Sequence, residues 1–134
     1  MKKDSLPLLI QIRTVKNQII NWNKEAAMYL ILMRHGEAVP QTEDVPNRER
    51  RLTKEGKKQV RTTSRMLARF LKDRPLRIFA SPFMRTRQTA RILSEECFAE
   101  GLHLTEELLQ GDFRRIENHL MTDGGPLALV GHHP

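Results

Sequence analysis

The sequence is nearly free of cysteine, with Cys97 alone among 134 residues. A single thiol cannot form a disulfide within the chain, which argues against a small disulfide-stabilised extracellular domain and favours a reducing compartment. Cys97 is equally well explained as a small buried apolar side chain. Aromatic residues are also scarce, at 5% of the chain, so the core has to be built from aliphatic side chains.

Long apolar runs are missing as well. No stretch approaches the ~20 consecutive apolar residues that a membrane-spanning helix needs. Near the N-terminus, Gln11 and Arg13 interrupt the apolar run, and no small-residue cleavage site of the kind that ends a signal peptide follows. We therefore expect a cytoplasmic protein.

Acidic residues are too few to balance the basic ones. The chain has 16 Asp and Glu against 23 Lys and Arg, which gives a formal charge of +7 and a pI near 10.1. The apolar fraction of 39% and the charged fraction of 29% fit one soluble globular domain. A basic surface permits nucleic acid, anionic membranes or phosphorylated substrates as partners, and selects none of them.

The first 27 residues differ in pattern from the rest. Apolar side chains recur there every three or four positions, at Leu8, Ile12, Val15, Ile19 and Trp22. This spacing predicts one face of a helix. We therefore divide the chain into a helical N-terminal extension, 1–27, and a domain that begins with the strand at Met28.

From Met28 onward, strand-like and helix-like segments alternate. Strands are predicted at 28–33, 77–80, 102–104 and 126–130, and helices at 53–72, 84–97 and 112–121. Thr53 is a suitable N-cap for the first of these helices. The alternation predicts an α/β fold, a three-layer sandwich around a mostly parallel sheet.

A cation or an imidazole follows three of the predicted strands. Arg34 and His35 follow the first strand, Arg85 lies just after the second, and His132 follows the last. Because ligands of open parallel sheets bind beyond the carboxyl ends of the strands, these side chains are expected to meet in one pocket.

This set of side chains suits phosphoryl chemistry. Two guanidiniums can bind a phosphoryl group and neutralise its oxygens. A neutral imidazole can attack phosphorus and form a covalent phosphohistidine, while a second, protonated imidazole stabilises the developing charge. Gly36 would let the backbone bend and bring its amide to the phosphate. We predict no metal, since the arginines supply the positive charge, and no cofactor.

Four ordered segments, "LMRHGEA", "LTKEGKKQ", "SPFMRTRQTA" and "LVGHHP", resemble the histidine phosphatase superfamily, also called phosphoglycerate-mutase-like. The likeness spans residues 28–134 and is strongest to SixA-type phosphohistidine phosphatases. It implies that His35 is the nucleophile, that Arg34 and Arg85 bind phosphate, and that His132 is the second pocket histidine. It also implies an acidic proton donor, for which Glu107 is the preferred match over Glu106.

The resemblance implies a signalling phosphatase whose substrate is phosphohistidine in a protein. Small phosphate esters are the alternative substrates. Family members continue beyond the position of Pro134 with a helix and at least one strand, so the domain is expected to be truncated. An inactive fragment that acts only as a basic binding module is therefore a second alternative.

A basic stripe on the first predicted helix is a further candidate feature. It consists of Lys54, Lys58, Arg61, Arg65, Arg69 and Lys72. A solvated outer face explains it best, and a docking surface for an acidic phosphoprotein is the alternative. No aromatic residues interleave with the stripe, which argues against nucleic acid.

Overall fold

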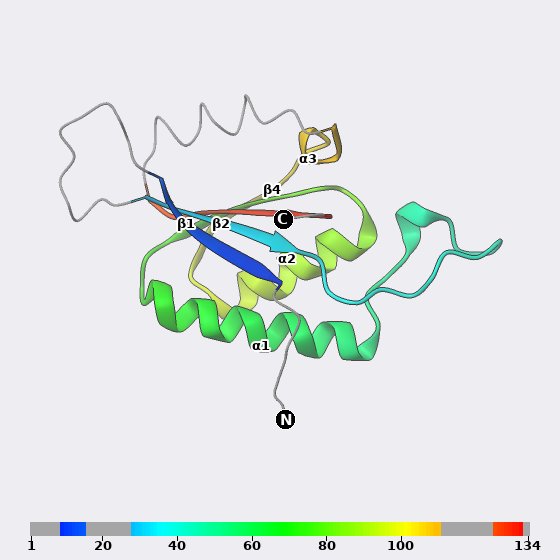
Figure 1. Ribbon diagram of the computed structural model, residues 1–134, viewed down its shortest axis with the longest axis horizontal. Helices are drawn as coiled ribbons and strands as arrows, with labels where there is room; N and C mark the ends of the chain where they lie inside the picture. The colour runs from blue at the N-terminus through cyan, green and yellow to red at the C-terminus, as the bar shows by residue number, and fades with distance from the viewer. Residues whose placement is uncertain (1–8, 16–27, 111–124, 133–134) are drawn as a thin grey trace.

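Five strands form a single sheet in the order β1-β2-β5-β3-β4 (Figure 1). The computed structural model describes residues 9–15, 28–110 and 125–132. The strands are β1 (Ile10–Val15), β2 (Met28–Arg34), β3 (Leu76–Ala80), β4 (Ala99–Leu104) and β5 (Leu127–Gly131). Four of them run parallel, and β1 alone is antiparallel, to β2. The predicted α/β fold with a mostly parallel sheet is confirmed.

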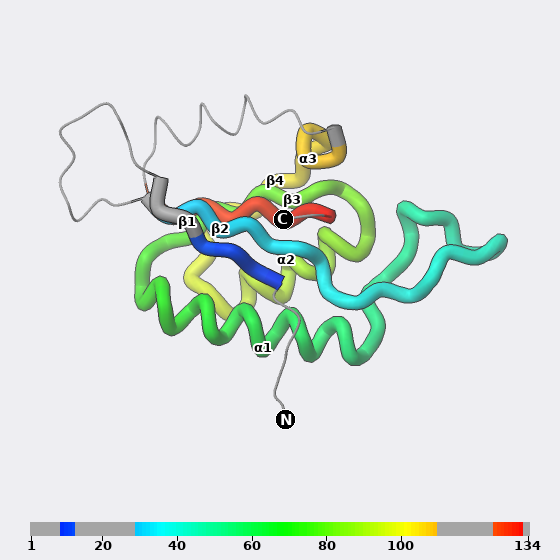
Figure 2. The backbone as a smooth tube through the Cα atoms, viewed as in Figure 1, coloured from blue at the N-terminus to red at the C-terminus, as the bar shows by residue number. Residues whose placement is uncertain are grey.

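The strand latest in the chain lies in the middle of this sheet. Strand β5 pairs with β2 on one side and with β3 on the other (Figure 2). Its burial on both faces explains why "LALV" is apolar at every position, as a central parallel strand requires. Strand β5 therefore joins two pairs of strands that come earlier in the chain.

Two long helices cover one face of the sheet (Figure 1). Helix α1 spans Lys54–Leu71 and begins where the Thr53 side chain accepts a hydrogen bond from the Gly56 amide, as predicted. Helix α2 spans Met84–Glu96. Two short elements complete the described structure, the 3-10 helix η2 (Asn47–Glu49) and α3 (Glu107–Gln110).

The main core lies between the sheet and these two helices. Side chains of β2, β3 and β5 meet side chains of α1 and α2 there, and the fully buried ones include Ile31, Ile78, Val130, Val60, Leu67 and Leu93. Aliphatic residues dominate this core, as the scarcity of aromatics requires. Burial of this apolar face is the main force that fixes the helices on the sheet.

A smaller apolar cluster lies on the opposite face of the sheet. Leu127 and Leu129 of β5 are buried there, with Leu30, Leu32 and Phe79 packed against them. Leu108 of α3 also packs on this cluster. The short α3 is thus the described helix on the second face of the sheet (Figure 1).

The helix predicted for the N-terminal extension is wrong for residues 10–15. These residues form β1, and their register pairs Ile10 with Met33 and Ile12 with Ile31. The segment is rich in β-branched residues and alternates apolar with polar side chains, which suits a strand at the edge of a sheet. The apolar spacing of this segment fits a helix and its alternation fits a strand, and pairing with β2 makes it a strand. The rest of the extension lies outside the described residues.

Other boundaries differ by small amounts. Strand β4 is longer than the three residues predicted, and the four-residue α3 was not predicted. The helix predicted at 112–121 lies outside the described residues. Within the described part of the chain, no helix is both long and apolar enough to cross a membrane.

Candidate active site

The carboxyl ends of β2, β3 and β5 are tied together by backbone hydrogen bonds. The His35 amide donates to the Gly131 carbonyl at 3.1 Å, and the Ser81 amide donates to the Val130 carbonyl at 3.1 Å. Strand β5 thereby fixes the residues that follow both of its neighbours. As a result, the ring centroids of His35 and His132 lie 5.6 Å apart, although 97 positions separate them in the chain.

Arg85 occupies the space between the two imidazoles. Its Nε lies 3.2 Å from Nε2 of His35, and its Nη2 lies 3.3 Å from Nδ1 of His132. Its Nη1 donates to the backbone carbonyl of Asn47 at 2.8 Å. The side chain is only 6% exposed. The structure therefore brings His35, Arg85 and His132 together around one point.

The hydrogen bonds of His35 define which of its nitrogens carries the proton. Nδ1 lies 2.7 Å from the carbonyl oxygen of Gly36, which can only accept. Nε2 faces Arg85, whose guanidinium can only donate. Neutral His35 is therefore protonated on Nδ1 and presents the lone pair of Nε2 to the site. That lone pair is the one a nucleophile needs.

The surroundings of His35 favour this neutral form. Burial is the largest cause that lowers its pKa below the ordinary value of 6.5. The positive charges of Arg85, Arg50 and Arg34 lower the pKa further, against the opposing effect of the Gly36 carbonyl. The ring is thus unprotonated, and available for attack, near neutral pH.

Arg34 and Arg50 add to the positive charge near His35. Arg34 ends β2, and its amide donates to the Leu9 carbonyl at 2.7 Å. Arg50 comes from the loop between β2 and α1, where its Nε donates to the Val39 carbonyl at 2.7 Å. Burial and Arg50 lower the pKa of Arg85. Sequence reasoning missed Arg50, because an irregular loop offers no periodicity that would show where its residues point.

Gly36 has a packing role, and the amide contact with a phosphate stays a prediction. Its N–H donates to the buried Thr89 hydroxyl at 3.2 Å. A Cβ at Gly36 would lie 2.7 Å from the Gly56 carbonyl oxygen, and one at Gly56 would lie 2.1 Å from the Glu37 carbonyl oxygen. The loop after β2 therefore rests directly on α1, and both glycines allow this approach.

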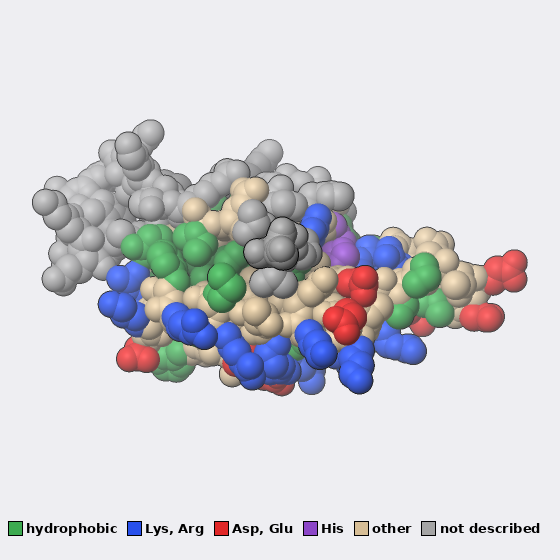
Figure 3. All heavy atoms as spheres, turned by 60° about the horizontal axis from the view of Figure 1, so that its bottom comes forward, with side chains coloured by type: hydrophobic (Ala, Val, Ile, Leu, Met, Phe, Trp, Pro, Cys, Tyr) green, Lys and Arg blue, Asp and Glu red, His purple; other side chains and the backbone are tan. Residues whose placement is uncertain are grey.

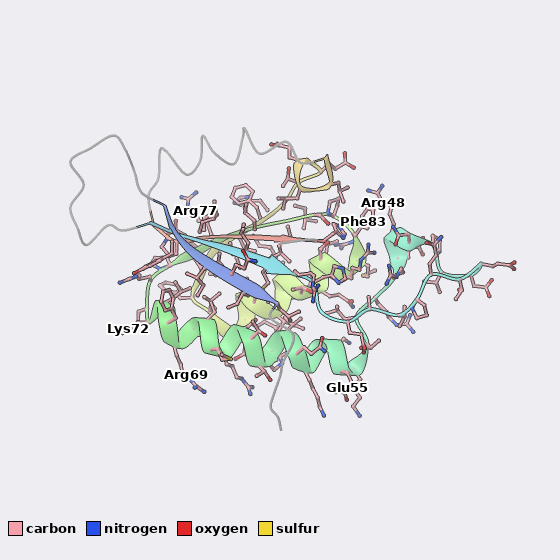
Figure 4. The ribbon with its side chains drawn as sticks, in the orientation of Figure 1. Arg48, Glu55, Arg69, Lys72, Arg77 and Phe83 are labelled. Atoms are coloured by element: carbon pink, nitrogen blue, oxygen red, sulfur yellow. The ribbon has the colours of Figure 1, made fainter. Side chains whose placement is uncertain are left out.

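The rim of the site contains Phe83, Arg48 and Glu106. The Phe83 ring contacts the His132 ring edge-on, with centroids 5.1 Å apart. The Arg48 guanidinium lies 5.1 Å from the Phe83 centroid and pairs with Glu106 at 3.4 Å (Figure 4). Glu107, the preferred proton donor, begins α3 directly beside this pair. Its proposed role depends on where a bound substrate places its leaving group.

The arrangement suits an anion better than a cation. Three arginines surround His35 closely enough to shift its pKa. Within the described residues, no group of three or more His, Cys, Asp or Glu side chains could hold a metal ion. A tetrahedral anion between the two imidazoles would meet guanidinium donors at the carboxyl edge of the sheet, where parallel sheets bind their ligands.

Comparison with known proteins identifies the family. The model of the histidine phosphatase superfamily, branch 1, matches residues 30–123. No curated protein matches the chain. Three of the similar solved structures illustrate the likeness. SixA from Agrobacterium tumefaciens is 21% identical with a TM-score of 0.64, over 78% of this chain and 68% of that one.

The other two structures are similar over comparable lengths. The protein histidine phosphatase SixA complexed with tungstate has a TM-score of 0.67 and 21% identity, over 78% of this chain and 69% of that one. Phosphoglycerate mutase from Plasmodium falciparum has a TM-score of 0.52 and 28% identity, over 79% of this chain and 61% of that one. The likeness to the two SixA structures shows a shared fold. The family model extends from β2 beyond α3, so the chain belongs to the histidine phosphatase superfamily.

Proposed function

We propose that this protein is a metal-independent phosphatase that passes through a phosphohistidine at His35. The observation that carries the proposal is the unprotonated Nε2 of a half-buried, neutral His35, which accepts a hydrogen bond from Arg85 and whose ring centroid lies 5.6 Å from that of His132. A nucleophile, a guanidinium donor and a second imidazole thus surround a space suited to one phosphoryl group.

In the first step, Nε2 of His35 attacks phosphorus. The N–P bond forms as the bond from phosphorus to the leaving group breaks, and the leaving group keeps the bonding electron pair. Arg85 turns its donors from the two imidazoles to the phosphoryl oxygens, joined by Arg34 and Arg50. His132, in its protonated form, donates to a further oxygen.

In the second step, water attacks the phosphorus of phosphohistidine, and the proton that the water releases passes to the carboxylate that protonated the leaving group in the first step. The N–P bond breaks, its electron pair returns to Nε2 of His35, and inorganic phosphate leaves. The hydrogen bond from Nδ1 to the Gly36 carbonyl holds the ring in one orientation throughout. The enzyme then regains the neutral His35 with which it began.

We propose phosphohistidine in a signalling protein as the substrate, with Glu107 as the proton donor to the leaving group. An imidazole departs more readily than an alkoxide, so this substrate needs less acid assistance. The positive charge of the chain would speed its encounter with an acidic phosphoprotein. Small phosphate esters are the competing substrate class.

The chemistry is tested by turnover of an aryl phosphate in EDTA. We expect activity in the wild type and its loss, by at least about a thousandfold, in His35→Ala, because the variant has no nucleophile. Acid-labile radiolabel on the denatured wild-type protein would identify the N–P bond. Activity that survives the substitution excludes covalent catalysis at His35, and activity lost in EDTA excludes a metal-free reaction.

The substrate is tested by comparing two donors at equal concentration. We expect kcat/KM on a phosphohistidine-bearing protein to exceed that on a small alkyl phosphate, and Glu107→Gln to reduce the alkyl phosphate rate more strongly. The opposite ranking of the two substrates would favour a small-molecule phosphatase. Binding of the phosphoprotein without turnover would instead favour a basic binding module.

A further inference from the structure

Two buried hydroxyl groups lie behind His132, on the side away from Arg85. Ser81 is the first residue after β3, and Thr86 lies in the first turn of α2; both side chains are 0% exposed. The Ser81 hydroxyl lies 2.9 Å from Nε2 of His132 and 2.6 Å from the Thr86 hydroxyl. Neither hydroxyl has a place in the reaction steps described above.

The hydrogen bonds that link Thr86, Ser81 and His132 have one direction, which follows from the atoms that can donate a proton. The Thr86 hydroxyl lies 2.8 Å from the Ser81 carbonyl oxygen and 2.9 Å from the Phe83 carbonyl oxygen, and both of these groups can only accept. The single proton of Thr86 is therefore directed at the backbone. Its oxygen accepts from Ser81, whose own oxygen is left to accept from Nε2–H of His132.

The opposite side of the imidazole leads independently to the same result. Nη2 of Arg85 lies 3.3 Å from Nδ1 of His132, and a guanidinium has no acceptor. Nδ1 must therefore be the unprotonated nitrogen when His132 is neutral. Both neighbours of the ring agree on one tautomer, with the proton on Nε2 and the lone pair of Nδ1 directed at Arg85.

We propose that Ser81 is a positioning residue that, with Thr86 behind it, fixes the tautomer and the orientation of His132. The inference rests on the proposed function, because it assigns Nδ1 of His132 as the atom that faces the phosphoryl group. Protonation of Nδ1 leaves the bond from Nε2–H to Ser81 in place. The ring can therefore change its charge without turning.

The first test measures the tautomer directly in the full-length chain labelled with 15N. Long-range 1H–15N spectra should show a protonated Nε2 and an unprotonated Nδ1 for neutral His132, with His132→Asn identifying the signals. A protonated Nδ1 in the neutral ring would overturn the proposal. This measurement needs no turnover, so its outcome is independent of whether the chain proves to be a phosphatase.

The second test removes the hydroxyl with Ser81→Ala. We expect the single Nε2–H signature of His132 to be lost and kcat on an aryl phosphate to fall about tenfold, as loss of one hydrogen bond to a catalytic group predicts, with a smaller change in KM. Thr86→Val should also disturb the tautomer, because it frees the proton of Ser81 to point at Nε2. An unchanged His132 spectrum in Ser81→Ala would overturn the proposal.

Ser64→Ala is the matched control. Ser64 is another fully buried serine, on the sheet-facing side of α1, and its hydroxyl has no hydrogen-bond partner among the described residues. We expect this variant to keep the wild-type kcat and the wild-type His132 spectrum. An equal loss of kcat in both alanine variants would mean that the loss in Ser81→Ala comes from disturbed packing, and it would contradict a positioning role.

Discussion

At the scale of single residues, the state of His35 makes the clearest prediction. Burial and the neighbouring arginines lower its pKa, so its titration midpoint should lie below 6.5. Attack requires the neutral ring, and the acid limb of kcat/KM should therefore also lie below pH 6.5. The measurement is the pH dependence of the His35 ring signals in NMR spectra of the wild type.

Arg50→Gln provides the control for this prediction. Removing one positive charge near the ring should raise the pKa of His35 toward 6.5. The pKa of His35 is lower in the folded chain than in the unfolded chain, so protonation of this histidine favours unfolding. The free energy of unfolding should therefore decrease as pH falls below about 6.5. A wild-type midpoint at or above 6.5 would contradict the description of the site.

Cys97 is predicted to be chemically inert in the native state. The residue directly follows α2 and is 8% exposed, and burial, followed by the charge of Glu96, raises its pKa to about 11. Only thiolates react readily with alkylating reagents, and a thiol with so high a pKa forms very little thiolate at neutral pH. Labelling with iodoacetamide at pH 7 should proceed only after unfolding by denaturant; rapid labelling of the native chain would contradict this environment.

Some site residues could be predicted from the sequence and others could not. His35, Arg85 and His132 follow strands closely, and the geometry of a parallel sheet brings such positions together without further information. Arg50 lies in an irregular loop, so its place depends on contacts that no local pattern encodes. The role of Ser81 depends on a contact 51 residues away, which only the folded chain reveals.

At the scale of elements, the contact between α1 and the loop after β2 should be sensitive to a single methyl group. Gly56→Ala would place a Cβ 2.1 Å from the Glu37 carbonyl oxygen, so the backbone that carries His35 must shift. We expect a loss of about 1–3 kcal/mol in the free energy of unfolding and a fall in kcat/KM of more than about tenfold. Chemical denaturation and aryl phosphate turnover measure the two effects.

Gly101→Ala is the control for that variant. A Cβ at Gly101, on the edge strand β4, would meet only the end of the His103 side chain, which can move aside. Activity should therefore stay close to that of the wild type. If Gly56→Ala were as active as Gly101→Ala, the close approach of the loop to α1 would not position His35.

Two arginines of the basic stripe on α1 join it to α2. Arg61 and Arg65 both pair with Glu96, and Arg61 also pairs with Glu95. These arginines hold the pKa of Glu96 below its ordinary value. Arg69 instead points away from the sheet (Figure 4), and Lys and Arg side chains are spread over this outer face (Figure 3).

Glu96→Gln should lower the melting temperature at neutral pH more than Glu95→Gln does. Glu96 accepts from two arginines, whereas the mostly exposed Glu95 has one contact at 3.3 Å. A carboxylate with a lowered pKa stabilises the folded state above its unfolded pKa. The difference from the wild type should therefore shrink as pH falls below about 4.5. Equal melting temperatures for the two variants would exclude a helix-joining role for Glu96.

The elements themselves differ in how well the sequence predicts them. Helix α1 has an N-cap, an apolar stripe and many turns, and each of these signals predicts a helix. Strand β1 also has spacing that fits a helix, and only pairing with β2 makes it a strand. Its conformation is therefore decided by tertiary contacts, which override a local pattern of this length.

At the scale of the whole molecule, β5 should be indispensable to cooperative folding. It lies between β2 and β3, and Ala128 and Val130 are buried against the helices while Leu127 and Leu129 are buried on the opposite face. A chain that ends at Gly125 should therefore lose its cooperative thermal transition. Differential scanning calorimetry measures this outcome, and a sharp transition in the shortened chain would contradict the central role of β5.

The position of β5 also governs when the protein becomes competent during its synthesis. The ribosome releases the strands from β1 to β4 first, and in the described sheet neither neighbouring pair can reach the other without the strand between them. His35 therefore stays apart from His132 until β5 has been synthesised and has inserted. The proposed site should therefore form in one event, when β5 leaves the exit tunnel and inserts between β2 and β3, and a nascent chain without β5 should lack the proposed activity.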